Sequence, residues 1–142
     1  MRRLRRGRDE RGANLVEFAL VLPLLLLLIL GIIEFGYLFA QYNEVRHGAH
    51  EGARLAAVDD SNLVVNTCDS MGLNGPVAVD FTALGTDAGD QGTVTVTLTV
   101  GTLSGLNFMS VFLPGSLSNT ATFKLEQPAT NWGSGSDANP CT

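Results

Sequence analysis

The stretch Gly12-Ala13-Asn14-Leu15-Val16-Glu17-Phe18 joins an arginine-rich start to an apolar run that extends from Phe18 to Ile33. Glu17 is therefore a single carboxylate at the edge of a segment that is hydrophobic enough to enter a membrane. A charged side chain within hydrocarbon costs roughly 2.5–3.5 kcal/mol on insertion scales, so Glu17 needs a partner. If a protease cut between Gly12 and Ala13, the new ammonium group of Ala13 would lie four residues from Glu17. The two charges could then pair, within one chain or between neighbours.

A second interpretation of Glu17 requires no proteolysis. A polar side chain near the end of a membrane helix can reach the headgroup layer, and Glu17 directly precedes the apolar run. In that case residues 1–12 stay attached, and the chain is a permanently anchored membrane protein with an external domain that binds a ligand or partner. The two interpretations differ in the mature amino terminus, which is Ala13 in the first and Met1 in the second.

Charge is distributed unevenly along the 142 residues. Six of the nine basic residues precede Gly12, and the remainder has three basic and twelve acidic residues, a formal balance of −9. A body this acidic is a poor match for nucleic acid, whose phosphates need basic partners. Arginines that flank a first membrane segment keep that end in the cytoplasm. We therefore expect a cytoplasmic leader, an extracytoplasmic carboxy terminus, and one small domain beyond the anchor.

The apolar run predicts one helix across the plasma (inner) membrane over residues 13–40, continued by an amphipathic stem over residues 41–58. Phe18–Ile33 alone has 16 residues, fewer than the roughly 20 that a bilayer needs. Phe35 and Phe39 lengthen the segment and suit the outer interface. A signal peptide is the main rival, but it has an apolar core of only about 7–15 residues and ends in a small-x-small site.

Small and polar residues within this helix predict contacts with neighbouring helices. Glycines let backbones approach closely, and a proline is tolerated in a membrane helix because nearby groups satisfy the freed carbonyl. Glu34 either pairs across helices or marks the outer interface. In the stem, Gly48 and Gly52 are four residues apart and would admit another backbone. The expected packing positions are Pro23, Gly31, Glu34, Gly36, Gly48 and Gly52.

Residues 59–142 predict a small antiparallel β-rich domain, which makes the fold class α+β. Thr93–Val100 alternates apolar residues with threonines, and Leu117–Glu126 alternates in the same way. Pro76–Phe81 is a shorter match. Leu106–Leu113 is apolar and aromatic, and we expect a short helix or loop packed on the sheet, or else a contact patch for a partner subunit.

The tail from Gln127 onward is rich in Gly, Ser, Asn and Pro, so only a covalent bond would fix it. Cys68 and Cys141 are the only cysteines, and both lie on the side expected outside. In an oxidising compartment they would pair and staple the domain. Their separation of 73 positions is unlike the C-x-x-C spacing of redox catalysts.

No residue pattern indicates an enzyme, a cofactor or a metal site. His47 and His50 are three apart on the predicted stem, with Glu51 nearby, and a metal-dependent enzyme is one alternative. No third ligand converges on them, so solvated surface histidines are favoured over zinc ligands. The glycine-rich segment Gly89–Gly92 lacks the lysine and helix of a phosphate-binding loop and predicts a turn.

The sequence RGANLVEFALVLPLLLLLILGIIEFGYLF (residues 11–39), with HEGARLAA (residues 50–57), resembles the TadE-like family of pilin-like proteins in tight-adherence (Tad) pilus systems. Its start resembles the processing site of class III type IV prepilins. The resemblance implies cleavage after Gly12 by a membrane prepilin peptidase, with Ala13 as the new terminus and Glu17 and Phe18 as the motif's acidic and aromatic pair. It also implies a structural minor pilin or pseudopilin that assembles with other pilus subunits for surface adhesion.

Overall fold

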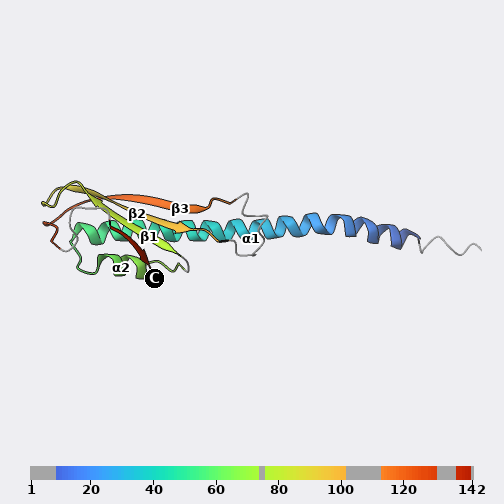
Figure 1. The fold of residues 1–142 in the computed structure, drawn as a ribbon. Coiled ribbons are helices and arrows are strands. Elements are labelled where there is room, and N and C mark those ends of the chain that lie inside the picture. The colour runs from blue at the N-terminus through green and yellow to red at the C-terminus, as the bar shows by residue number, and fades with distance from the viewer. Residues whose placement is uncertain (1–8, 74–75, 102–112, 131–136, 142) are drawn as a thin grey trace, which may run out of the picture. The chain divides into compact units, whose positions relative to one another are not determined.

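A computed structural model describes residues 9–73, 76–101, 113–130 and 137–141. The chain divides into two compact units, Met1–Gly36 and Tyr37–Thr142, which we call the first and the second unit. One long helix, α1 (Asp9–Ala57), contributes residues to both units (Figure 1).

α1 begins at Asp9, four residues before the predicted start at Ala13. Pro23 lies inside the helix and does not end it. A continuous helix over the apolar run and the stem is therefore confirmed.

The second unit contains a four-stranded antiparallel sheet with the order β3-β2-β1-β4. Three of its strands lie within a few residues of those predicted. The fourth is not indicated by the sequence, because it contains a proline and lacks apolar alternation. The tail that begins at Gln127 therefore ends in a strand. The predicted segment Leu106–Leu113 lies outside the described residues except for Leu113. The strands are β1 (Val77–Ala83), β2 (Gln91–Thr99), β3 (Ser116–Lys124) and β4 (Asp137–Cys141).

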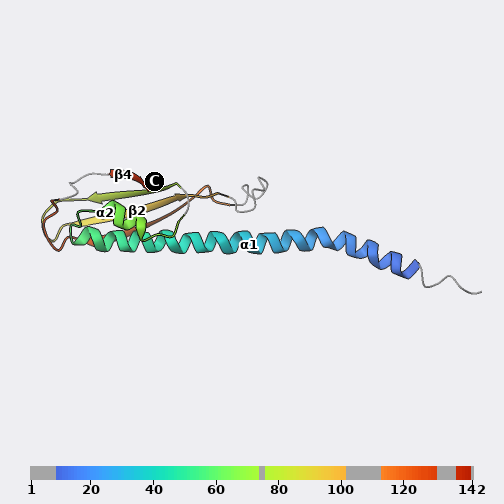
Figure 2. The same cartoon turned by 90° about the horizontal axis from the view of Figure 1, so that it is seen from below.

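One face of the sheet packs on the part of α1 that belongs to the second unit (Figures 1 and 2). In β2 the apolar residues Val94, Val96 and Leu98 are almost completely buried, and the threonines between them are half-buried or exposed. Val45 and Ala49 of α1 are also completely buried. Burial of a large apolar side chain contributes about 1.5–3 kcal/mol, so a one-residue slip of β2 would expose most of this core.

A short helix, α2 (Leu63–Asp69), follows α1 and is not indicated by the sequence. Its seven residues include β-branched types that have weak helix propensity, so tertiary packing must hold it. Thr67 is fully buried, and its hydroxyl donates a hydrogen bond of 2.7 Å to the carbonyl of Leu63. That bond removes the main cost of placing a hydroxyl in the core.

The end of α1 is tied to the segment that follows β3. Asp59 has a φ of 51°, in the left-handed region where helices commonly end. Its buried carboxylate accepts hydrogen bonds from the backbone N–H of Thr130 at 2.9 Å and from the Thr130 hydroxyl at 2.7 Å. The backbone N–H of Glu126 donates to the carbonyl of Ala57 at 2.9 Å. These contacts hold the last turn of α1 in place.

Candidate functional site

In the first unit, the predicted processing segment Gly12–Phe18 is helical and exposed throughout. Ala13 and Glu17 are four residues apart, so they lie on the same face of α1, one turn from each other. Within the part of the chain that the structure describes, Glu17 has no hydrogen bond or ion pair. A Cβ atom added at Gly12 would meet nothing within 4 Å. Within the described residues, the chain on both sides of the expected cut is therefore accessible.

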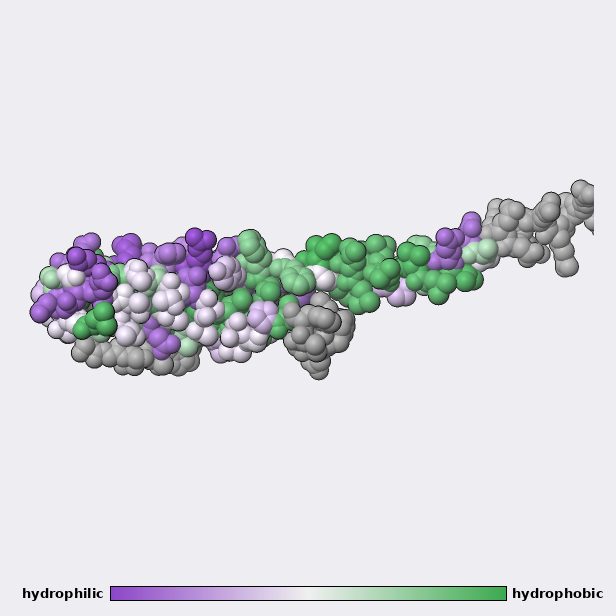
Figure 3. Space-filling model, turned by 90° about the horizontal axis from the view of Figure 1, so that it is seen from above, coloured by the Kyte–Doolittle hydropathy of each residue, from purple (hydrophilic) through white to green (hydrophobic). Residues whose placement is uncertain are grey.

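The helix that follows has an apolar surface. Every residue from Gly12 to Leu30 is exposed, and hydrophobic side chains cover most of this part of α1 (Figure 3). The helix is long and apolar enough to cross a membrane. An exposed apolar surface of this extent marks a membrane or protein contact. Added Cβ atoms at Gly31 and Gly36 would meet nothing within 4 Å, and Glu34 is buried, with 3% of its surface exposed.

The two stem glycines have neighbours within their own chain. A Cβ added at Gly48 would overlap the side chain of Met71, and one at Gly52 would lie 3.0 Å from both Thr67 and Val94. In the described residues the close approach at both positions is made by side chains of the second unit itself. The glycine spacing therefore reflects internal packing here, and no sequence signal pointed to Met71 or Thr67 as the contacts.

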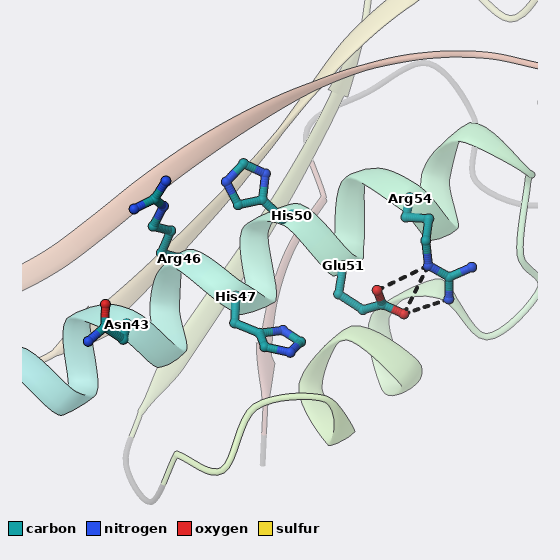
Figure 4. Close-up of a pocket in the computed structure, with 6 residues that line it drawn as sticks. All are labelled: Asn43, Arg46, His47, His50, Glu51 and Arg54. Carbon is teal, nitrogen blue, oxygen red and sulfur yellow. Dashed lines mark hydrogen bonds and ion pairs between the residues drawn. The ribbon is translucent and has the colours of Figure 1, made fainter.

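A shallow groove lies on the face of α1 that the sheet leaves open (Figure 4). At this face Arg46, His47, His50 and Arg54 are exposed. His47 and His50 point in different directions (Figure 4). Within the described residues, no three His, Cys, Asp or Glu side chains gather in a way that would hold a metal ion. The groove is lined by Asn43, Arg46, His47, His50, Glu51 and Arg54.

Glu51 and Arg54 form an ion pair along this groove. The guanidinium of Arg54 donates to the Glu51 carboxylate, with Nη2 to Oε1 at 2.6 Å and Nε to Oε2 at 3.0 Å. These hydrogen bonds lower the pKa of Glu51 below its ordinary value of 4.5, and the positive charge of Arg54 acts in the same direction. The Arg54 side chain is 65% exposed, so solvent screens the pair and it adds little stability.

Cys68 of α2 and Cys141 of β4 form a disulfide, as expected from the sequence, and their Cα atoms are 5.6 Å apart. The bond holds the end of the chain against α2. β4 contains five residues and pairs only with β1 among the described strands, so the covalent link supplements a short ladder of hydrogen bonds. Structural disulfides of this kind persist in oxidising compartments.

Comparison with known proteins gives one match. Residues 12–54 match the family model described as TadE-like protein, which confirms the resemblance over that segment. The matched residues cover the processing segment, the apolar helix and most of the stem. No curated protein and no solved structure matches the chain.

Proposed function

We propose that this chain, with residues 12–54 as its TadE-like segment, is a minor pilin or pseudopilin that is cut after Gly12 and then helps to assemble a pilus used for surface adhesion. The observation that carries the proposal is the order of the segment: a basic leader, a glycine, an acidic and aromatic pair, and an apolar helix. The proposed role is structural, and the chain is not an enzyme.

The exposed geometry of the segment supports cleavage. Among the described residues, nothing lies within 4 Å of a Cβ added at Gly12, and Ala13 is exposed, which leaves the bond between them open to a membrane peptidase. Cleavage removes the leader with its six arginines and creates an ammonium group on Ala13. Because Ala13 and Glu17 share a helix face, the new charge can neutralise Glu17 in the same chain or in a neighbouring subunit.

The same order of events explains how the helix can leave the membrane for a filament. A carboxylate paired with an ammonium group is far less costly in an apolar environment than a carboxylate alone. We expect the cleaved helix to pack against other pilin helices through its apolar surface. The expected topology has the leader in the cytoplasm, residues 13–40 in the plasma membrane, and the second unit outside, where the disulfide is stable.

Treatment with a matching prepilin peptidase tests the first step. We expect mass spectrometry to show a chain shortened by 12 residues, with Ala13 first. Gly12→Leu should block the cut, because a bulky side chain then precedes the scissile bond. Gly31→Leu is the matched control, since neither glycine has an atom within 4 Å of an added Cβ. Recovery of the intact leader from pilus-bearing cells would contradict the proposal and favour a permanently anchored protein.

Glu17→Gln tests the second step. We expect the variant to be cleaved as well as the original chain but to be assembled into pili much less, because the new ammonium group on Ala13 then lacks its counter-charge. Glu51→Gln removes an acidic residue from the stem and should assemble normally. Immunoblotting of sheared pili against whole membranes would measure the fraction assembled. Normal assembly of Glu17→Gln would show that the charge pair has no role.

A further inference from the structure

The two edges of the sheet differ. In the order β3-β2-β1-β4, β3 and β4 are the outer strands. β3 has nine residues and no proline, whereas β4 has five and includes Pro140. Exposed edge strands can pair with other chains, and natural proteins usually shorten, charge or interrupt them. β4 follows that rule and β3 does not.

The hydrogen bonds between β2 and β3 identify which backbone groups of β3 point outward. The N–H of Val100 donates to the carbonyl of Gly115, and the N–H of Leu125 donates to the carbonyl of Asp90. Both pairs fit the β2 to β3 register, so the odd-numbered residues of β3 bond to β2. The even-numbered residues therefore direct their N–H and C=O groups away from the sheet. They are Ser116, Ser118, Thr120, Thr122 and Lys124.

Within the described residues, none of these five has a further backbone partner. Their side chains are all exposed on the sheet face opposite α1. β3 thus offers a row of five donors and five acceptors at regular spacing, with Lys124 as its single charge. The inward side chains of the same strand continue the core, since Ala121 and Phe123 are buried and Leu117 is partly buried.

The β4 edge offers far fewer outward backbone groups than the β3 edge. The N–H of Leu84 donates to the carbonyl of Gln91, so the even-numbered residues of β1 bond to β2 and its odd-numbered residues bond to β4. In β4 this leaves only Ala138 and Pro140 with outward backbone groups. Proline has no N–H, and one donor remains along that edge.

We propose that the β3 edge is a strand-addition site, which accepts an extended segment of another polypeptide as a fifth, antiparallel strand. The segment that fits has apolar residues on the α1 side, beside Leu117 and Phe123, and small hydroxyl residues on the other side, beside Ser118 and Thr122. A carboxylate near its Lys124 end would find the only positive charge of the strand. The proposal is independent of cleavage after Gly12 and of the pilus assignment.

A peptide copied from β2 is a suitable probe, because residues 91–99 already pair with β3 from its other side. We would add this peptide, with flanking glutamates for solubility, to the full chain in detergent micelles. The expected result is saturable binding with new protection of the amide protons of Ser118, Thr120 and Thr122 in hydrogen-exchange measurements. Unchanged exchange at these three amides would overturn the proposal.

Thr120→Pro and Thr120→Ala provide the matched comparison. Both remove the hydroxyl of Thr120, which lies 2.9 Å from that of Thr95, but only proline removes the outward N–H. The inward backbone ladder is kept in both variants, because the backbone N–H and C=O groups of Thr120 do not bond to β2. We expect at least a tenfold loss of peptide affinity in Thr120→Pro and little change in Thr120→Ala.

Two other results of these experiments would contradict the proposal. Equal affinity of the two variants would overturn the proposal, since binding would then not use the strand edge. A third variant, Ser118→Pro, removes the neighbouring outward N–H and should weaken binding in the same way. If the chain instead formed dimers through β3, sedimentation would show a mass increase abolished by Thr120→Pro without peptide. A second copy would then be the occupant, and the proposed heterologous segment would be wrong.

Discussion

The ring of Phe123 lies over Gly92, its direct partner across β2 and β3. No side chain fits at Gly92, because an added Cβ atom would overlap the ring and lie 2.8 Å from the backbone carbonyl oxygen of Thr82. An aromatic ring that covers a cross-strand glycine fills the space that the glycine leaves and fixes strand register. Gly92 and Phe123 thus fill one packing position together.

Gly92→Ala should therefore destabilise the second unit by about 1–3 kcal/mol, the usual cost of an overpacked core. The carbonyl of Thr82 belongs to β1 and cannot move aside cheaply. Chemical denaturation of the full chain in detergent would measure the change in midpoint. Gly72→Ala is the control, since its added Cβ would meet nothing within 4 Å. Equal midpoints for the two variants would refute this account of the contact.

Loss of the disulfide should also destabilise the second unit. Closing a loop between residues separated by 73 positions restricts the unfolded chain, and the entropy model gives about 4 kcal/mol. Cys68→Ser, Cys141→Ser and the double variant should have similar midpoints, because each removes the same bond. Reductant should lower the midpoint of the original chain and leave the double variant unchanged. A single variant as stable as the oxidised chain would contradict this expectation.

The pair Glu51 and Arg54 should be visible in acid titration. Because Arg54 lowers the pKa of Glu51, the pair's stabilising effect is present above pH 4.5 and is lost as the pH falls through the lowered pKa. Arg54→Gln should raise the pKa of Glu51 toward 4.5, as measured by the NMR shift of its side-chain carboxyl. Arg46→Gln removes an equal charge from the same groove and should leave the titration nearly unchanged. An equal shift in both variants would mean that the hydrogen bonds are not the cause.

Amide exchange in the free protein should alternate along β3. The N–H groups of Asn119 and Ala121 bond to β2 and should exchange slowly, whereas those of Ser118 and Thr120 point outward and should exchange much faster. Hydrogen exchange resolved by residue would show this pattern without any ligand. Uniform protection along the strand would mean that its outer groups are already paired.

The sequence predicted α1 and three strands because each has a clear apolar period. Thr93–Val100, for instance, alternates without interruption, and the structure places β2 at Gln91–Thr99. α2 and β4 escaped prediction because tertiary contacts hold them: Thr67 packs on the helix glycine Gly52, and Cys141 is bonded to Cys68. No local pattern carries that information.

In the candidate site, too, some features could be predicted from local sequence and others depend on tertiary contacts. The motif Gly12–Phe18 could be recognised from residue types and spacing, and the family match includes it. The roles of Gly48 and Gly52 could not, because a small residue gives no indication of which surface approaches it. The open edge of β3 could not be predicted either. It depends on whether the odd- or the even-numbered residues bond to β2, which follows from the strand register and is known only when the neighbouring strands are known.

The bond between Cys68 and Cys141 has a mechanical consequence. When tension is applied between the two ends of the chain, the covalent path runs from α1 through α2 and crosses directly to residue 141. The load bypasses β1, β2 and β3, which lie within the bridged loop. A stretched chain can lengthen only where the force travels, which is outside the loop that Cys68 and Cys141 close.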